Sequence, residues 1–175
     1  MSRHPGRPGP VPLTRRRFGI VAGGAALATV AGSGRAAPVP GRFSPAFTVM
    51  KKIVRPAKAA APVGPYSHAV RLGNLLFCSG QIPLDPATGQ LVAGDIRAQT
   101  ERVLENIRII LEDQGLGFAH VVKSTVFLTN LGEFAGMNEV YARYFAGDFP
   151  ARSTVQVAAL PRGAAVEIEV VAAAD

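Results

Sequence analysis

Arg152 is the residue of this sequence whose type and position most clearly offer binding chemistry. Pro150 has no backbone N–H and biases Phe149 towards an extended conformation, so no helix can pass through this point. The segment 155–157 that follows favours a strand because its residues are mostly β-branched. We therefore expect Arg152 at the entrance of a strand, where its planar guanidinium could bind a carboxylate through two parallel hydrogen bonds. The competing interpretation is an arginine that is merely exposed at the end of a loop.

A tyrosine and a glycine earlier in the chain could line a binding cleft. Tyr66 directly follows a turn at 64–65, because a Gly-Pro pair does not fit inside a regular element. Its phenol could face a cleft, or its ring could lie at the edge of the core with the hydroxyl in water. Gly80 lies between the polar residues Ser79 and Gln81, which indicates a close approach of the backbone to a ligand or to another chain segment.

The roles of three further polar residues depend on which face of their strand or helix they occupy. In the segment 165–172, which favours a strand, Glu167 and Glu169 alternate with aliphatic residues and share one face. Both acids could face solvent, or one of them could guard a site. Asn138 adjoins an aromatic stripe on a predicted helix, so its amide needs a partner if it is buried. This stripe is typical of a core or a subunit interface and consists of Phe134, Met137, Tyr141 and Tyr144.

The sequence offers no other catalytic or metal-binding pattern, so we expect neither a metal nor a cofactor. The single cysteine, Cys78, excludes an internal disulfide and any site built from several cysteines. It lies in an apolar run, where a small buried hydrophobic residue is the better interpretation. The sequence has no phosphate-binding loop, no His/Cys metal spacing and no Ser-His-acid arrangement.

The excess of positive charge is confined to the first fifty residues. The chain has 175 residues and a formal net charge of +7. Residues 1–50 hold seven arginines and no acidic residue, whereas residues 51–175 hold 12 basic and 12 acidic residues. The main domain therefore lacks the electrostatic footprint of a nucleic-acid-binding protein, and we expect no nucleic-acid partner.

The basic leader is typical of a signal peptide for the twin-arginine export route. A twin-arginine pattern at 14–18 precedes an apolar run at 19–31, which is too short for a membrane span of about 20 residues. We expect an exported, periplasmic protein without a membrane partner after removal of the signal. If translation instead starts at Met50, the protein is cytoplasmic. The expected division is a signal peptide at 1–37, a linker at 38–50 and one domain at 51–175.

The residue patterns of the domain predict eight helices and strands in the order β-β-β-α-β-α-β-β. The first helix should begin after Asp95 and end at Gly115, and the second should begin with a capping box of Asn130 and Glu133. This order fits an α+β fold in which both helices pack on one face of a mixed β-sheet. The other face would be apolar and uncovered, which argues for a closed oligomer. The predicted strands are 53–55, 67–72, 75–82, 121–128, 153–157 and 165–172.

Six short blocks of the domain carry a resemblance to a known protein family. The blocks are Gly64-Pro65-Tyr66-Ser67, Ser79-Gly80-Gln81-Ile82-Pro83, residues 122–128, Asn138, residues 149–153 and residues 166–169. Together they resemble the Rid (YjgF) family of reactive-intermediate imine/enamine deaminases, over nearly all of residues 52–172. The resemblance implies a chorismate-mutase-like fold and a homotrimer with clefts between its subunits.

The resemblance also implies a role for each candidate residue. Arg152 would bind the substrate carboxylate, Glu167 would lie near the attacking water, and Tyr66 would complete the catalytic group. Many deaminating members of the family carry a cysteine where this chain has Thr154, a departure that bears on packing and on the response to oxidation. The implied substrate-binding residues are Arg152, Ser79, Gly80, Asn138 and Thr154.

The implied reaction is the hydrolysis of a 2-imino or enamine acid to a 2-keto acid and ammonia. Because the imine is already reactive, orientation of the substrate and proton transfer by Glu167 would suffice. Two alternatives stay open. One is a non-catalytic trimer that binds small carboxylates or keto acids. The other is an endoribonuclease or translation-inhibitor activity, against which the balanced charge of the domain counts.

Overall fold

The computed structural model describes residues 50–145 and 147–174. The expected signal peptide at 1–37 and nearly all of the expected linker at 38–50 lie outside the described residues, so export stays a prediction. Within the described ranges, no helix is both long enough and apolar enough to span a membrane.

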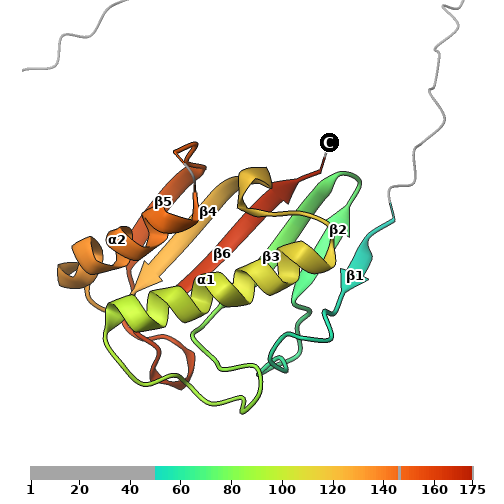
Figure 1. The fold of residues 1–175 in the computed structure, drawn as a ribbon. Coiled ribbons are helices and arrows are strands. Elements are labelled where there is room, and N and C mark those ends of the chain that lie inside the picture. The colour runs from blue at the N-terminus through green and yellow to red at the C-terminus, as the bar shows by residue number, and fades with distance from the viewer. Residues whose placement is uncertain (1–49, 146, 175) are drawn as a thin grey trace, which may run out of the picture. The chain divides into compact units, whose positions relative to one another are not determined.

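One mixed β-sheet of six strands organises the described domain (Figure 1). All neighbouring strands are antiparallel except β4 and β5, which run parallel. The last strand of the chain, β6, inserts between β3 and β4 at the centre of the sheet. In sheet order the strands are β1 (Lys52–Val54), β2 (Ala69–Leu72), β3 (Leu75–Gln81), β6 (Val166–Ala173), β4 (Val121–Leu128) and β5 (Ala151–Gln156).

Two helices, α1 (Ile96–Asp113) and α2 (Phe134–Tyr144), pack on the same face of this sheet (Figure 1). The start of α1 is as predicted, since the Asp95 carboxylate accepts a hydrogen bond from the N–H of Ala98 at 3.1 Å. Its end is also as predicted, because Gly115 follows the helix with a φ of +72°, a conformation that favours glycine. The α+β fold class and the predicted order of elements are confirmed.

The capping box predicted for the second helix is wrong. A 3₁₀ turn (Leu131–Glu133) precedes α2, and the Asn130 side chain accepts a hydrogen bond from the N–H of Gly132 at 2.9 Å. Glu133 then occupies the cap position of α2, and its side chain makes no capping hydrogen bond. Asn130 is therefore the cap of the turn that leads into α2, but within the described residues the Glu133 carboxylate forms no hydrogen bond back to the Asn130 N–H, which a capping box requires.

The alternation of side chains along each strand gives the sheet a helix-covered face and an open face. On the covered face, Val166, Ile168 and Val170 of β6 are buried in the core beneath the helices. On the open face, Phe77 and Val155 remain 42% and 43% exposed. Figure 1 shows both helices on the other face of the sheet. The predicted uncovered face is therefore present, but it is only partly apolar, because Lys123, Thr125 and Glu169 also lie on it.

Candidate active site

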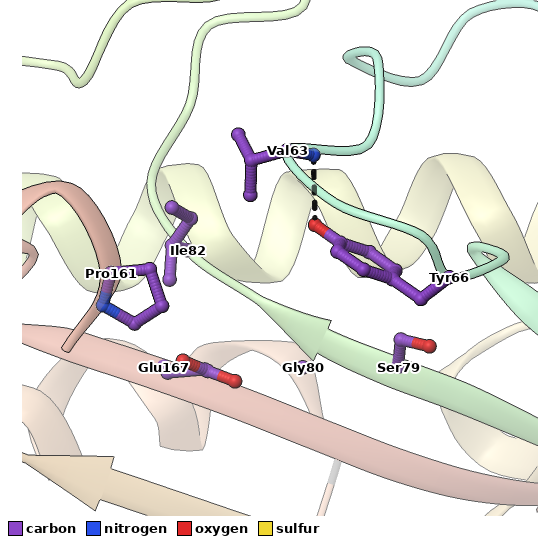
Figure 2. Close-up of a pocket in the computed structure, with 7 residues that line it drawn as sticks. All are labelled: Val63, Tyr66, Ser79, Gly80, Ile82, Pro161 and Glu167. Atoms are coloured by element: carbon purple, nitrogen blue, oxygen red, sulfur yellow. Dashed lines mark hydrogen bonds between the residues drawn. The ribbon is translucent and has the colours of Figure 1, made fainter.

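The Glu167 pocket is one of the pockets that contain predicted site residues (Figure 2). Its volume is about 180 Å³. The turn before β2 supplies Tyr66, β3 supplies Ser79 and Gly80, and β6 supplies Glu167. The pocket thus gathers residues that are up to a hundred positions apart in the chain. Its other lining residues are Val63, Ile82 and Pro161.

A β-bulge brings the Glu167 side chain against the backbone of Gly80. The register of β3 and β6 shifts within residues 78–81, so that Ser79 and Gly80 together lie opposite Glu169. A Cβ atom at position 80 would overlap Oε1 of Glu167 and would lie 2.8 Å from its Cδ. An added Cβ would therefore force the Glu167 side chain to move away from the backbone. The close approach expected at this glycine is that of a side chain from the neighbouring strand.

The electrostatics of the Glu167 pocket favour a protonated carboxyl. Burial raises the pKa of Glu167, and the negative charge of Glu169 raises it further. A carboxyl with a raised pKa keeps its proton to a higher pH. A raised pKa makes Glu167 a better proton donor and acceptor at higher pH than an exposed glutamate.

Hydrogen bonds hold Tyr66 and Ser79 at the pocket. The Tyr66 hydroxyl accepts a hydrogen bond from the N–H of Val63 at 3.1 Å, which closes the turn (Figure 2). The Ser79 hydroxyl donates to the carbonyl of Ser67 at 2.7 Å and so ties β3 to the residue after Tyr66. Because the Tyr66 oxygen acts as an acceptor here, its own proton remains available to a ligand.

The Arg152 pocket is another of these pockets, with a volume of about 430 Å³. Arg152 is the second residue of β5, as expected for a strand entrance, and Asn138 comes from α2. The guanidinium carbon lies 4.6 Å from the ring centroid of Tyr141 and 5.7 Å from that of Phe134. Within the described residues, Arg152 forms no ion pair with an acidic side chain. The remaining lining residues are Ala142, Phe149 and Pro150.

Two buried oxygen atoms in this region lack a hydrogen-bond partner in the described part of the chain. They are Oδ1 of Asn138 and Oγ1 of Thr154. Thr154 lies two residues after Arg152 on the same face of β5, although it is not among the residues that line the pocket. Buried polar atoms without a partner are rare in native proteins, so these oxygens are candidates to bind a ligand or a water molecule.

The sheet places Arg152 and Glu167 on opposite faces. Arg152 pairs with Ser124 in the β4–β5 ladder, and Ser124 is buried on the covered face. Glu167 pairs with Phe127 in the β4–β6 ladder. Ser124 and Phe127 are three residues apart on β4, so their side chains point to opposite faces and are separated by about 10 Å along the strand. One chain therefore does not bring Arg152 and Glu167 onto the same small ligand.

Seven of the lining residues carried no site prediction: Val63, Ile82 and Pro161 in the Glu167 pocket, and Tyr141, Ala142, Phe149 and Pro150 in the Arg152 pocket. The sequence could have indicated Tyr141 as a site residue, because it lies one helical turn after Asn138 on the same side of α2. Ile82 and Pro161 had no local signal. Pro161 reaches the Glu167 pocket only because the turn between β5 and β6 brings it there.

Cys78 plays no part in either pocket. It is 5% exposed, and burial raises the pKa of its thiol to about 12, so almost no thiolate exists at neutral pH. The prediction that Cys78 is a small buried hydrophobic residue is confirmed. The described residues contain no group of three or more His, Cys, Asp or Glu side chains that could hold a metal ion.

The fold and the pockets define a class: small α+β proteins with one mixed sheet, helices on one of its faces and a pocket at each face. A family model described as Endoribonuclease L-PSP matches residues 56–174. Among solved structures, that of E. coli TdcF with bound serine is 41% identical with a TM-score of 0.68, and the match covers 71% of this chain and 99% of TdcF.

Curated relatives match along most of their own length. Protein DfrA of Myxococcus xanthus is 56% identical over 124 residues, which covers 70% of this chain and 95% of DfrA. The 2-iminobutanoate/2-iminopropanoate deaminase of Bos taurus is 46% identical over 125 residues, covering 71% and 91%. Reactive Intermediate Deaminase A of Arabidopsis thaliana chloroplasts is 43% identical over 166 residues, covering 91% and 89%. The chain belongs to the endoribonuclease L-PSP family, which is the Rid (YjgF) family that its six sequence blocks resemble.

The contact between Gly80 and Glu167 gives a prediction about stability. Gly80→Ala should destabilise the protein by about 1–3 kcal/mol, as overpacking does, because the added Cβ overlaps the Glu167 carboxyl. In a Glu167→Ala background the clashing atoms are gone, and the same change should cost less than about 0.5 kcal/mol. Urea unfolding of the four proteins measures both values. An equal loss in both backgrounds would show that another contact requires the glycine.

The raised pKa of Glu167 gives a prediction about pH. Because its pKa is higher in the folded state, Glu167 contributes stability that is complete below its ordinary pKa and is lost as the pH rises through the raised value. Glutamine does not ionise, so the melting temperature of Glu167→Gln minus that of the wild type should increase from about pH 4 to about pH 8. Glu169→Gln is the control. Its melting temperature minus that of the wild type should depend less on pH, because burial contributes more than Glu169 to the raised pKa of Glu167. A difference that does not depend on pH would contradict the raised pKa.

Proposed function

We propose that the protein is a hydrolytic deaminase that converts 2-imino or enamine acids to 2-keto acids and ammonia. Water adds to the carbon of the C=N bond, and ammonia leaves as the new carbonyl forms. The observation that carries the proposal is the presence of two chemically complementary groups, one in each pocket. One is an arginine fork with no acidic partner in the described chain, and the other is a half-buried carboxyl with a raised pKa. The name of the bovine relative supports the same activity.

Arg152 is proposed to bind the substrate carboxylate. Its guanidinium lies on the Tyr141 ring and not in an ion pair with a described acid, so its N–H groups remain available for two parallel hydrogen bonds. Oδ1 of Asn138, which has no partner in the described chain, could accept a hydrogen bond from the substrate nitrogen. The TdcF structure supports this class of ligand, because serine also carries a carboxylate next to a carbon that bears nitrogen.

Glu167 is proposed to move the protons. As a carboxylate it would accept a proton from the attacking water, and as an acid it would return one to the departing nitrogen. Its raised pKa increases the fraction of the protonated form at any given pH and so supports this double role. The proton of the Tyr66 hydroxyl could stabilise negative charge that develops on the substrate.

We propose that the complete site forms between two chains of a homotrimer. Arg152 and Glu167 face opposite sides of one sheet, so a complete site would take one residue from each of two chains. The exposed apolar side chains of the open face, among them Phe77 and Val155, could contact a second chain, and β5 is an edge strand of the sheet. Closed cyclic symmetry would repeat the contact and complete every site.

The description of the family as endoribonucleases raises the alternative of an RNA substrate. An RNA-binding surface draws on an excess of lysine and arginine to neutralise phosphates. Residues 51–175 hold equal numbers of basic and acidic residues. Both pockets are also small compared with an RNA groove. These observations favour a small carboxylate as the ligand.

Mixing two inactive variants tests the shared site. Arg152→Ala and Glu167→Ala should each lose nearly all turnover of imino acids generated in situ by an amino-acid oxidase. When the two are assembled together in equal amounts, about one interface in four would combine both intact halves, so about a quarter of the wild-type activity should return. The control is assembly of Arg152→Ala with Arg152→Lys, where no interface regains an arginine.

Two outcomes would contradict the proposal. Mixed trimers that form without any recovery of activity would place the whole site in one chain. If the wild type does not accelerate imine loss at all, the protein is not a deaminase, and a trimer that only binds carboxylates becomes the better interpretation.

The geometry of the arginine fork gives a separate prediction. In Arg152→Lys, kcat/KM should fall roughly 30- to 150-fold, because losing two parallel charged hydrogen bonds removes about 2–3 kcal/mol of transition-state stabilisation. Arg152→Ala should be at least as impaired, and the melting temperature should change little in either variant. Near-wild-type turnover by Arg152→Lys would mean that the residue acts only as a diffuse charge.

A further inference from the structure

We propose that Tyr141 is a positioning residue: its ring holds the Arg152 guanidinium in the orientation that binds a carboxylate, and Ser124 fixes the ring. This inference rests on the proposed role of Arg152 as the carboxylate anchor. It adds to that role the reason why the anchor is ordered before a substrate arrives.

The first observation is the contact between the charge and the ring. The guanidinium carbon of Arg152 lies 4.6 Å from the centroid of Tyr141, well within the range of a cation–π interaction, and Phe134 lies at 5.7 Å. Burial raises the pKa of the Tyr141 hydroxyl, although Ser124 and Arg152 act in the opposite direction. The attraction is therefore to a neutral ring and not to a phenolate.

The second observation is that Tyr141 is itself fixed. Its hydroxyl and the hydroxyl of Ser124 form a buried hydrogen bond of 2.7 Å. Ser124 is also the residue that pairs with Arg152 in the β4–β5 ladder. The strand pairing sets Arg152 relative to Ser124, and the hydrogen bond sets Tyr141 relative to the same serine. Ser124 thus positions both the Tyr141 ring and the strand that carries Arg152.

A ring orients an arginine without occupying the fork of its hydrogen-bond donors. An acidic neighbour would also hold the guanidinium, but it would use the fork that the substrate carboxylate needs. A stacked ring attracts the positive charge over its face and, unlike a carboxylate, does not use the two parallel donors of the fork. At most one guanidinium N–H is directed to the Tyr141 hydroxyl, whose pKa Arg152 lowers in part through a side-chain hydrogen bond. Tyr141 also stacks on Phe145 at 4.5 Å, which supports the ring from within the core. Order that exists before binding strengthens binding, because less side-chain freedom is lost when the ligand arrives.

Fluorination of the ring tests this proposal without changing its shape. Tyr141→Phe removes only the hydroxyl, and pentafluorophenylalanine at position 141 keeps the ring but removes its attraction for a cation. The probe is 2-oxobutanoate, a 2-keto acid of the proposed product class, with the dissociation constant measured by titration calorimetry. We expect Tyr141→Phe, which loses the hydrogen bond to Ser124, to bind about 3- to 10-fold more weakly than the wild type. The fluorinated protein should bind about 5- to 30-fold more weakly than Tyr141→Phe. Wild-type affinity of Tyr141→Phe would show that Ser124 does not fix the ring.

The matched control is the same pair of changes at Tyr144, one turn further along α2. The Tyr144 ring packs on Phe118, and its hydroxyl donates to Glu105, so fluorination there should not change binding of the keto acid. Melting temperatures confirm that all variants are folded.

The binding measurements test the role of Tyr141 separately from the proposed deaminase activity. If the wild type binds 2-oxobutanoate but does not accelerate imine loss, the deaminase proposal fails while the fluorination series still decides the role of Tyr141. Equal affinity of the phenylalanine and pentafluorophenylalanine proteins would overturn the role proposed for Tyr141. Absence of binding by the wild type at millimolar 2-oxobutanoate would overturn it as well.

Discussion

The alternation of side chains across a single β-sheet is the constraint on which the rest of this structure depends. Helices α1 and α2 cover one face, and pairing with β4 assigns Arg152 to that face and Glu167 to the other. No rotamer change can move a side chain through a sheet. The proposed chemistry therefore needs a second chain, and the exposed apolar side chains of the uncovered face supply a physical reason for one to bind.

The two pockets control charge in different ways. In the Glu167 pocket, a β-bulge and a glycine let a carboxyl pack against backbone, and the loss of water raises its pKa. In the Arg152 pocket, an aromatic ring lies over a cation that has no acidic partner in the described chain. In the proposed shared site, the cation would bind the carboxylate of the ligand and the half-buried acid would exchange protons with it.

Local patterns predicted most of the fold. The helix spacing, the cap at Asp95 and the left-handed glycine at Gly115 act through neighbouring residues, and the structure has all three. The error at Glu133 came from a single 3₁₀ turn, which depends on how the chain leaves β4 and not on the residues of the cap alone. The aromatic stripe of α2 was assigned to a core or an interface, and its pattern did not reveal that Tyr141 contacts Arg152.

The sequence by itself determined the fold class, the family and the identity of the chemically capable residues, because periodicity, caps and motif blocks are properties of neighbouring residues. It also indicated a close approach at Gly80. Only the tertiary structure decided what approaches that glycine, which residues share a pocket and which face each one occupies. The physical reason is strand register: a shift of one residue in the pairing of β6 would move Glu167 to the other face, and no local pattern encodes how strands far apart in the chain align.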